Sequence, residues 1–347
     1  MAESTLSVGY ADLRRVIGRY LGIGTTTTSW TATEVATVTD IMSSALRQFY
    51  FPPPVGGMVP HEWSFLKPTL ELDTIAPYDT GTIAVALAGT TVTLTDGVWS
   101  SWAATHGSLI VDNAEYVIDS RTDDTDIELA DAWTETTETA AEYTLQHNGN
   151  YDLPDDFGGI EGKMVIESSN YNPDIILVGE GKIRSMRQQT PLSSSATVTP
   201  FYAAVRPKKH ATTTTGQRFE IMFYPLPGAV YTISYTQRVN PQMLVSTTLE
   251  YPYGGAVHAE TIRAACLAAA EEQQNGNRLN GSPVYDKKNL FAERLAASIQ
   301  IDKQMNGIEY YGYNADNSDA VHRPYPSNTN ERNRNRDTGL VTYNGNT

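Results

Sequence analysis

Acidic side chains are the first residues in this 347-residue chain whose types and spacing could do chemistry. Asp124, Asp126 and Glu128 alternate along one segment, as ligands do at the start of a calcium-binding loop. The segment lacks the glycine and the distal glutamate of an EF-hand loop. Alternating acids on the exposed face of a strand explain it equally well, so a solvated strand and a cation site are the two alternatives here.

Asp155 and Asp156 form a second acidic pair, which could in principle act as an acid and a base. They lie in a turn rich in Pro and Gly, where aspartate is favoured for its turn chemistry alone. We therefore expect no catalytic role for this pair. In the whole chain we expect no catalytic residue, no metal ion and no cofactor.

Histidine and cysteine give weaker candidates. His258-Ala259-Glu260 opens an alanine-rich segment but is shorter than a metal-binding motif, so we expect a structural or capping role. The single cysteine, Cys266, falls on an apolar face of the same segment without a placed His partner, which predicts a buried small hydrophobe. The sequence contains no Walker loop, no Rossmann glycine pattern after a strand and no HExxH motif. We predict that the protein is not an enzyme.

Basic residues concentrate at two places. Residues 206–210 are Arg-Pro-Lys-Lys-His, and the C-terminal segment carries Arg332, Arg334 and Arg336. Either group could contact a phosphate backbone, although a short run of this kind is more often a solvated loop. The formal net charge of −15 argues against sequence-specific binding of nucleic acid.

Most of the negative charge falls between residues 77 and 145. This segment holds thirteen Asp and Glu residues against one basic residue, Arg121. Apolar and polar residues alternate at 82–87, 91–95 and 115–118, and a period of two marks half-buried strands. Turn residues separate these runs, so five or six short strands fit, in a small barrel or sandwich.

Helical periodicity occurs toward both ends of the chain. We expect helices at residues 10–21, 32–50, 256–274 and from Ser282-Pro283 to about 305. Thr31 and Glu34 match a capping box, and Gly22 lies where a glycine would end the first helix. Residues 160–245 have a mixed pattern with strands near 219–224 and 231–235.

Together these patterns predict an α+β fold. We expect a helical bundle built from the N- and C-terminal helices, with an inserted small β-barrel or sandwich domain and a flexible C-terminal arm. The expected parts are N-terminal helices and a linker (1–76), an acidic β insert (77–145), a mixed β region (146–255), C-terminal helices (256–313) and an extended arm (314–347). No run approaches 18 consecutive apolar residues and the start lacks the features of a secretory signal, so we expect no membrane-spanning segment.

Short motifs along the chain occur in a characteristic order. They are Phe-Tyr-Phe-Pro at 49–52, Trp-Ser-Phe-Leu at 63–66, Tyr-Asp-Leu-Pro at 151–154, Phe-Gly-Gly at 157–159, Tyr-Pro-Tyr-Gly-Gly at 251–255 and Ala-Ala-Glu at 269–271. In this layout the chain resembles the structural head-to-tail connector (adaptor) proteins of tailed bacteriophages. The resemblance covers most of the chain outside the acidic insert.

The resemblance implies a structural protein of the virion neck that is made in the host cytoplasm. Such adaptors form a ring, commonly of twelve copies, between the portal protein and a downstream tail or neck protein, and DNA passes through the channel without sequence-specific binding. Their C-terminal segment docks on the portal, which the polar residues after Asn314 suit. The residues expected to dock are Tyr325, Arg332, Arg334, Arg336, Leu340 and Tyr343.

Two other functions stay open from the sequence. One is a tail or fibre component with a glycan- or receptor-binding β module, in which Trp99, Trp102 and Trp133 would form a stacking platform. The other is a hydrolase with its acids on the β insert, although no nucleophile–base pair is placed. The sequence also leaves open whether the acidic insert faces the channel or points outward.

Overall fold

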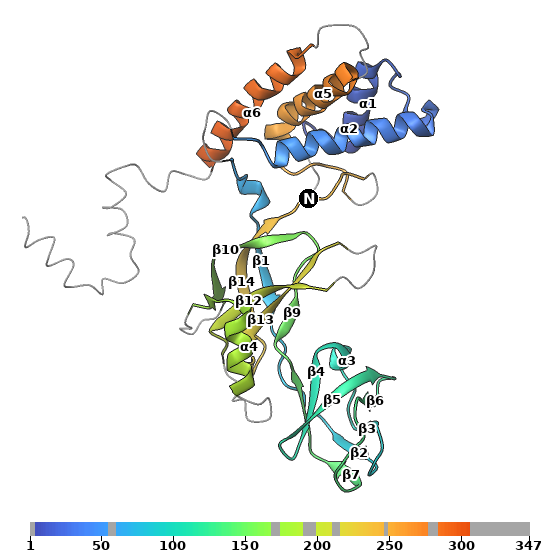
Figure 1. The fold of residues 1–347 in the computed structure, drawn as a ribbon, viewed down its shortest axis with the longest axis vertical. Helices are drawn as coiled ribbons and strands as arrows, with labels where there is room; N and C mark the ends of the chain where they lie inside the picture. The colour runs from blue at the N-terminus through green and yellow to red at the C-terminus, as the bar shows by residue number, and fades with distance from the viewer. Residues whose placement is uncertain are drawn as a thin grey trace, which may run out of the picture.

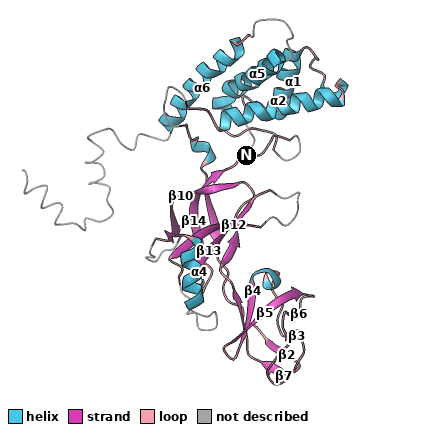
Figure 2. Cartoon of the chain, viewed as in Figure 1, coloured by secondary structure: helices cyan, strands magenta, loops and turns pink. Residues whose placement is uncertain are grey.

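The computed structural model describes residues 4–54, 60–167, 174–189, 199–209, 216–245, 249–276 and 284–305. The molecule contains both helices and sheets, with the four long helices grouped at one end, which is consistent with the predicted α+β class (Figure 2). Three layers follow one another along the longest axis (Figure 1). We call them the helical tier, the middle tier and the distal tier.

The helical tier is formed by α1 (Tyr10–Leu21), α2 (Ala32–Tyr50), α5 (Ala259–Gly276) and α6 (Asp286–Met305), with the 3₁₀ turns η1 (Thr27–Ser29), η2 (Ser64–Leu66) and η4 (Ala256–His258). The middle tier is formed by β1 (Thr69–Asp73), β9 (Asn150–Asp152), β10 (Phe157–Ile166), β11 (Ile176–Leu177), α4 (Glu180–Gln189), β12 (Tyr202–Lys208), β13 (Arg218–Tyr224) and β14 (Thr232–Val239). The distal tier is formed by β2 (Thr82–Val85), β3 (Thr91–Thr95), α3 (Ala103–His106), β4 (Gly107–Val111), β5 (Ala114–Arg121), β6 (Asp126–Leu129), β7 (Glu138–Ala141) and β8 (Thr144–His147).

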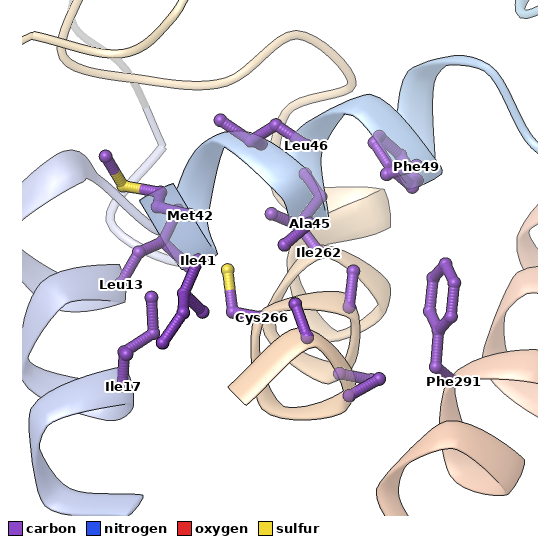
Figure 3. Close-up of a cluster of buried hydrophobic side chains, with 14 of the residues drawn as sticks. Leu13, Ile17, Ile41, Met42, Ala45, Leu46, Phe49, Ile262, Cys266 and Phe291 are labelled. Atoms are coloured by element: carbon purple, nitrogen blue, oxygen red, sulfur yellow. The ribbon is translucent and has the colours of Figure 1, made fainter. Parts of the chain in front are cut away.

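The helical tier joins segments from opposite ends of the chain around one core. Side chains from α1, α2, α5 and α6 point toward one another there, among them Ile17, Ile41, Cys266 and Phe291 (Figure 3). The alanines of α5 are mostly buried, and their small side chains let the neighbouring helices approach closely. On α6, Phe291, Leu295 and Ile299 form the buried face that the sequence predicts.

Local signals set the ends of α1 and α2. The Thr31 hydroxyl accepts a hydrogen bond from the Glu34 backbone N–H at 3.3 Å, and the Thr31 N–H donates to the Glu34 carboxylate at 2.7 Å. This is the predicted capping box. Gly22 follows α1 with φ at +79°, the left-handed conformation that glycine adopts most easily.

Two sheets make up the middle tier. Their strand orders are β1-β14-β10 and β11-β12-β13-β9, and their shared core includes Phe157, Ile221, Phe223 and Ile233. The helix α4 packs on the second sheet through Ile183 and was not expected from the sequence. Ile183 is the only buried residue of α4, so the helix has no apolar stripe that would mark it.

The distal tier is one curled seven-stranded half-barrel sheet with the strand order β7-β2-β3-β6-β5-β4-β8. The sequence predicted five or six short strands in a small barrel or sandwich, so the structure has at least one strand more. The short β7, Glu-Thr-Ala-Ala, has no alternation of buried and exposed positions that would mark it. The chain enters and leaves this tier side by side, since Tyr78 and Leu145 exchange backbone hydrogen bonds of 3.0 and 2.7 Å.

The described residues cover only part of the predicted C-terminal region. The third expected helix begins as η4 and continues as α5 to Gly276. The fourth is α6, but its expected start at Ser282-Pro283 lies outside the described residues, as does the arm at 314–347. The five-part division of the chain stays a prediction.

Candidate functional site

The alternating acids at 124–128 are engaged by their neighbours. Asp126 accepts a hydrogen bond from the Thr93 hydroxyl at 2.6 Å, and Glu128 accepts one from Thr91 at 2.8 Å. Asp124 pairs with Arg121. Among the described residues no group of three His, Cys, Asp or Glu side chains could hold a metal ion. These observations favour the solvated strand over the cation site.

Asp155 and Asp156 both have structural partners. The carboxylate of Asp155 pairs with Arg218 at 2.7 Å. Asp156 accepts a hydrogen bond from the Gln237 side-chain amide at 2.8 Å, and its backbone carbonyl accepts one from the Asn240 N–H at 2.7 Å. The pair therefore ties the turn before β10 to β13 and β14.

His258 and Cys266 are both in the core of the helical tier. Cys266 is fully buried, and burial raises the pKa of its thiol to about 12, so the reactive thiolate is suppressed. The His258 ring lies 5.2 Å from the Trp63 ring and 5.3 Å from the Phe65 ring, measured between centroids. Burial lowers the pKa of His258, which favours its neutral form. Both residues occupy the structural positions that the sequence predicts.

The structure assembles one polar cluster that the sequence does not reveal. Asp302, at the end of α6, is buried and lies 2.8 Å from the His61 Nε2 atom. Its carboxylate also accepts hydrogen bonds from the Ser64 hydroxyl and from the Ser64 backbone N–H at 3.2 Å. Residues 64 and 302 are far apart in sequence, and no local pattern links them.

This cluster contains the residue types of a Ser-His-Asp triad in the wrong order. In a triad the histidine lies between the serine and the aspartate and takes the serine proton. Here Asp302 lies between Ser64 and His61, and Ser64 donates to the carboxylate. The arrangement holds the end of α6 against the segment that descends to the middle tier, so we interpret it as a structural clamp.

A cavity of about 330 Å³ lies beside the clamp, where the helical and middle tiers meet. Tyr50, Trp63 and Leu66 supply much of its apolar wall. An ion-pair network crosses the same junction: Lys67 contacts Glu62 at 3.0 Å and Glu161 at 2.7 Å, and Arg238 contacts Glu62 at 2.9 Å. These ion pairs join the segment that contains Glu62 and Lys67 to β10 and β14, and so hold the helical and middle tiers together.

The basic run at 206–210 is largely neutralised where the structure describes it. Arg206 pairs with Glu220 in the neighbouring strand, and Lys208 contacts Asp152 at 2.5 Å. His210 lies outside the described residues. The paired side chains suit a stable sheet better than a phosphate-binding patch.

The structure does not form the tryptophan platform on which the receptor-binding alternative depends. Trp99 and Trp133 are 1% and 2% exposed, and both belong to the core of the distal tier. Their indole N–H groups donate to the carbonyls of Thr125 at 2.9 Å and Thr136 at 2.8 Å. Trp102 is half-buried against the same core, so these three rings do not form an open stacking surface. The alternation pattern predicts strands, but it does not show whether an aromatic residue in a connection between strands packs into the core or stays exposed.

The acids of the distal tier, in contrast, all reach solvent. Of the thirteen Asp and Glu residues between 77 and 145, ten are exposed, three are half-buried and none is buried. Asp79, Asp112 and Glu142 line an open cleft of about 610 Å³ on this tier. The charge therefore acts as a surface field, which repels polyanions at short range and is screened by salt over about 10 Å.

Comparison with known proteins adds no family to these observations. No protein-family model matches the chain, and no curated protein matches its sequence. Within the described ranges, none of the helices combines the length and the apolar character needed to cross a membrane. The residues expected to dock on a portal lie outside the described residues; they are Tyr325, Arg332, Arg334, Arg336, Leu340 and Tyr343.

Proposed function

We propose that this protein is a structural head-to-tail adaptor of a tailed-phage virion, which forms a ring in the neck and does not act as an enzyme. The observation that carries the proposal is the arrangement of three tiers along one axis, with most of the net negative charge on the distal tier (Figure 1). In a ring of such chains each tier becomes one level. Most of the net negative charge then lies in a single annulus.

The acidic level has a physical role in a neck through which DNA travels. Basic side chains that neutralise phosphates release counterions from the DNA, and this release favours binding. Each such contact therefore slows a passing duplex. A wall of solvated carboxylates repels the phosphates and leaves the duplex free to slide. We therefore infer that the distal tier lines the channel, with DNA as a passing partner that is not bound in a sequence-specific way.

The remaining parts are assigned by the same proposal. The four helices form the bundle of the ring wall, and the half-barrel is the inserted domain. The arm, residues 314–347, docks on the portal in this proposal. A downstream tail or neck protein contacts the opposite side of the ring.

Electron microscopy of the native particle, with mass spectrometry of the co-purifying chains, tests this proposal. The expected result is a closed ring between the portal and the tail, with the distal tier facing the channel. A ring whose distal tier points outward would contradict the channel assignment alone. Finding the chain at a distal tip or in a fibre would overturn the adaptor function and favour the receptor-binding alternative.

Deletion of residues 315–347 tests the docking arm separately. The shortened chain is expected to keep its melting temperature, because the described hydrophobic clusters of all three tiers lie outside the deleted residues. It should no longer co-sediment with portal rings. A chain in which the arm is replaced by a Gly/Ser linker of equal length is the control for chain length, and equal attachment of the full and shortened chains would contradict the docking role.

A further inference from the structure

The helix α6 has a second apolar face that no described element covers. Its buried face, formed by Phe291, Leu295 and Ile299, packs on α5. Leu290 and Ile301 are each 37% exposed. With 3.6 residues per turn, Leu290, Ala297 and Ile301 fall within about 40° of one another and about 140° from the buried face. A helix with two apolar faces is suited to lie between two partners.

Arg294 lies within this exposed face. It is four residues after Leu290 and three before Ala297, which places its side chain on the same stripe. The side chain is exposed and makes no ion pair with another described residue. We call Leu290, Arg294, Ala297 and Ile301 the α6 stripe.

A groove with an acidic rim runs between α2 and α5. It has a volume of about 330 Å³, and its lining includes the small side chains of Thr37, Ser44 and Ala269. The carboxylates of Asp40 and Glu272 are exposed at its rim, and neither forms an ion pair with another described residue. We call these five residues the α2–α5 groove.

The groove can take part of the stripe and is opposite to it in charge. Thr37 and Ser44 are seven residues apart, as are Leu290 and Ala297, so each pair spans about 10 Å of helix, and Ile301 lies about one turn beyond. Ridges of one helix pack into grooves between residues of another at this spacing. The guanidinium of Arg294 would reach the two rim carboxylates, which are the only charged residues that line the groove.

We propose that the α6 stripe of one copy of this chain packs into the α2–α5 groove of a second copy. Stripe and groove are different surfaces of the chain, so the contact is head-to-tail. Repeated contacts of this kind close into a ring if the rotation between copies allows it. The inference rests on the proposed function in that it names the surfaces by which neighbouring copies would join.

Cysteine cross-linking of the full chain tests the contact directly. The Asp40→Cys/Arg294→Cys variant, oxidised at the concentration where copies associate or when bound to portal rings, is expected to give a ladder of covalent multimers. Cys266 is fully buried and does not compete. The matched control is Asp40→Cys/Lys303→Cys, because Lys303 is exposed on α6 away from the stripe. No ladder, or an equal ladder in the control, overturns the proposal.

Charge reversal supplies an independent measurement. Arg294→Glu is expected to weaken association of copies about tenfold or more, while Lys303→Glu leaves it unchanged. Adding Asp40→Lys and Glu272→Lys to Arg294→Glu is expected to restore much of the affinity. If Arg294→Glu leaves the affinity between copies unchanged, the proposed contact is wrong. It is also wrong if the triple variant associates no more tightly than Arg294→Glu alone.

The outcomes also separate this inference from the adaptor function. A neck ring seen in particles whose chains do not cross-link through the stripe would overturn the inference and keep the function. If Asp40→Cys/Arg294→Cys gives a ladder that the control lacks, but the chain is found elsewhere in the particle, the inference is supported and the adaptor function is overturned. If the groove instead holds residues 306–347 of its own chain, Asp40→Cys/Arg294→Cys gives no ladder and the proposed contact is wrong.

Discussion

At the scale of single residues, the buried carboxylate of Asp302 holds the end of α6 against the segment that leads to the middle tier. It is 1% exposed and serves three donors, two of them on Ser64 and one on His61. A buried charge is tolerated only when its hydrogen-bonding capacity is used. The clamp therefore depends on the charge of Asp302 as well as on its shape.

Replacing Asp302 with Asn is expected to lower the free energy of unfolding by about 2 kcal/mol. The amide keeps the volume but loses charge-assisted hydrogen bonds and turns an N–H group toward the Ser64 donor. Urea unfolding followed by circular dichroism measures the change. Glu293→Gln, an exposed change of the same kind on α6, should alter stability by less than about 0.5 kcal/mol. Equal effects of the two changes would show that the clamp contributes nothing.

His147 makes stability depend on pH. Burial lowers its pKa to about 3, with further contributions from His106 and Arg187, and its Nδ1 accepts the Gly149 N–H at 3.1 Å. The unfolded chain takes up a proton on this ring near pH 6.5, whereas the folded chain does not until about pH 3. The unfolded state therefore binds more protons between these values, and stability falls as pH is lowered through this range.

The expected loss from this histidine is about 1.5 kcal/mol between pH 6.5 and pH 5, since the unfolded ring is half protonated at pH 6.5 and the slope reaches about 1.4 kcal/mol per pH unit only below it. His147→Asn keeps an acceptor for the Gly149 N–H but cannot take up the proton. Urea midpoints at the two pH values, read from tryptophan fluorescence, should differ less in this variant than in the parent. An unchanged pH dependence would remove His147 as its source.

At the scale of elements, α1 shows packing overriding helix propensity. Gly18 is buried within the helix, where glycine is normally unfavourable. A Cβ atom at this position would lie 2.4 Å from the Trp30 ring and 2.6 Å from the Gly24 carbonyl oxygen. The glycine therefore lets the turn after α1 fold back against the helix.

Gly18→Ala is expected to destabilise the protein by about 1–3 kcal/mol, because the steric cost exceeds the gain in helix propensity. Gly181 provides the matched control: it lies in α4, and a Cβ there would meet nothing within 4 Å. Gly181→Ala should therefore be neutral or stabilising by up to about 1 kcal/mol. Thermal melts of the two variants measure the contrast, and shifts of the same sign would contradict it.

The sequence predicts the elements that carry their own local signals. α1 and α2 were predicted with their observed bounds because a capping box, a terminal glycine and an apolar stripe mark them. α4 was not predicted, since it has no apolar stripe. The clamp between Ser64 and Asp302 could not be predicted, because only the folded chain brings those segments together. The buried tryptophans were misassigned for the same reason.

At the scale of the whole molecule, each tier has its own buried core. The core of the distal tier is drawn from residues between 78 and 145, and that of the helical tier from both ends of the chain. Separate cores allow one tier to change without unfolding the others. The acidic surface is thus carried by a unit that the rest of the fold does not require.

We expect residues 75–148, expressed alone, to fold. Their core contains fourteen buried hydrophobic residues and needs none from outside the segment. A cooperative urea transition followed by tryptophan fluorescence would support this expectation. The fragment carrying Ile83→Ala is the control, because loss of this fully buried side chain should lower the free energy of unfolding by about 2–5 kcal/mol. A fragment without a cooperative transition would contradict it.

The paired bridge between Tyr78 and Leu145 has an evolutionary consequence. Because the chain leaves the middle tier and returns at adjacent positions, a single genetic insertion or deletion could add or remove the whole distal tier and leave the flanking strands in register. Antiparallel partners are only about 5 Å apart, so a foreign domain whose own termini lie close together could be spliced in at the same bridge. The position is therefore a natural fusion point for displaying cargo at one end of the molecule.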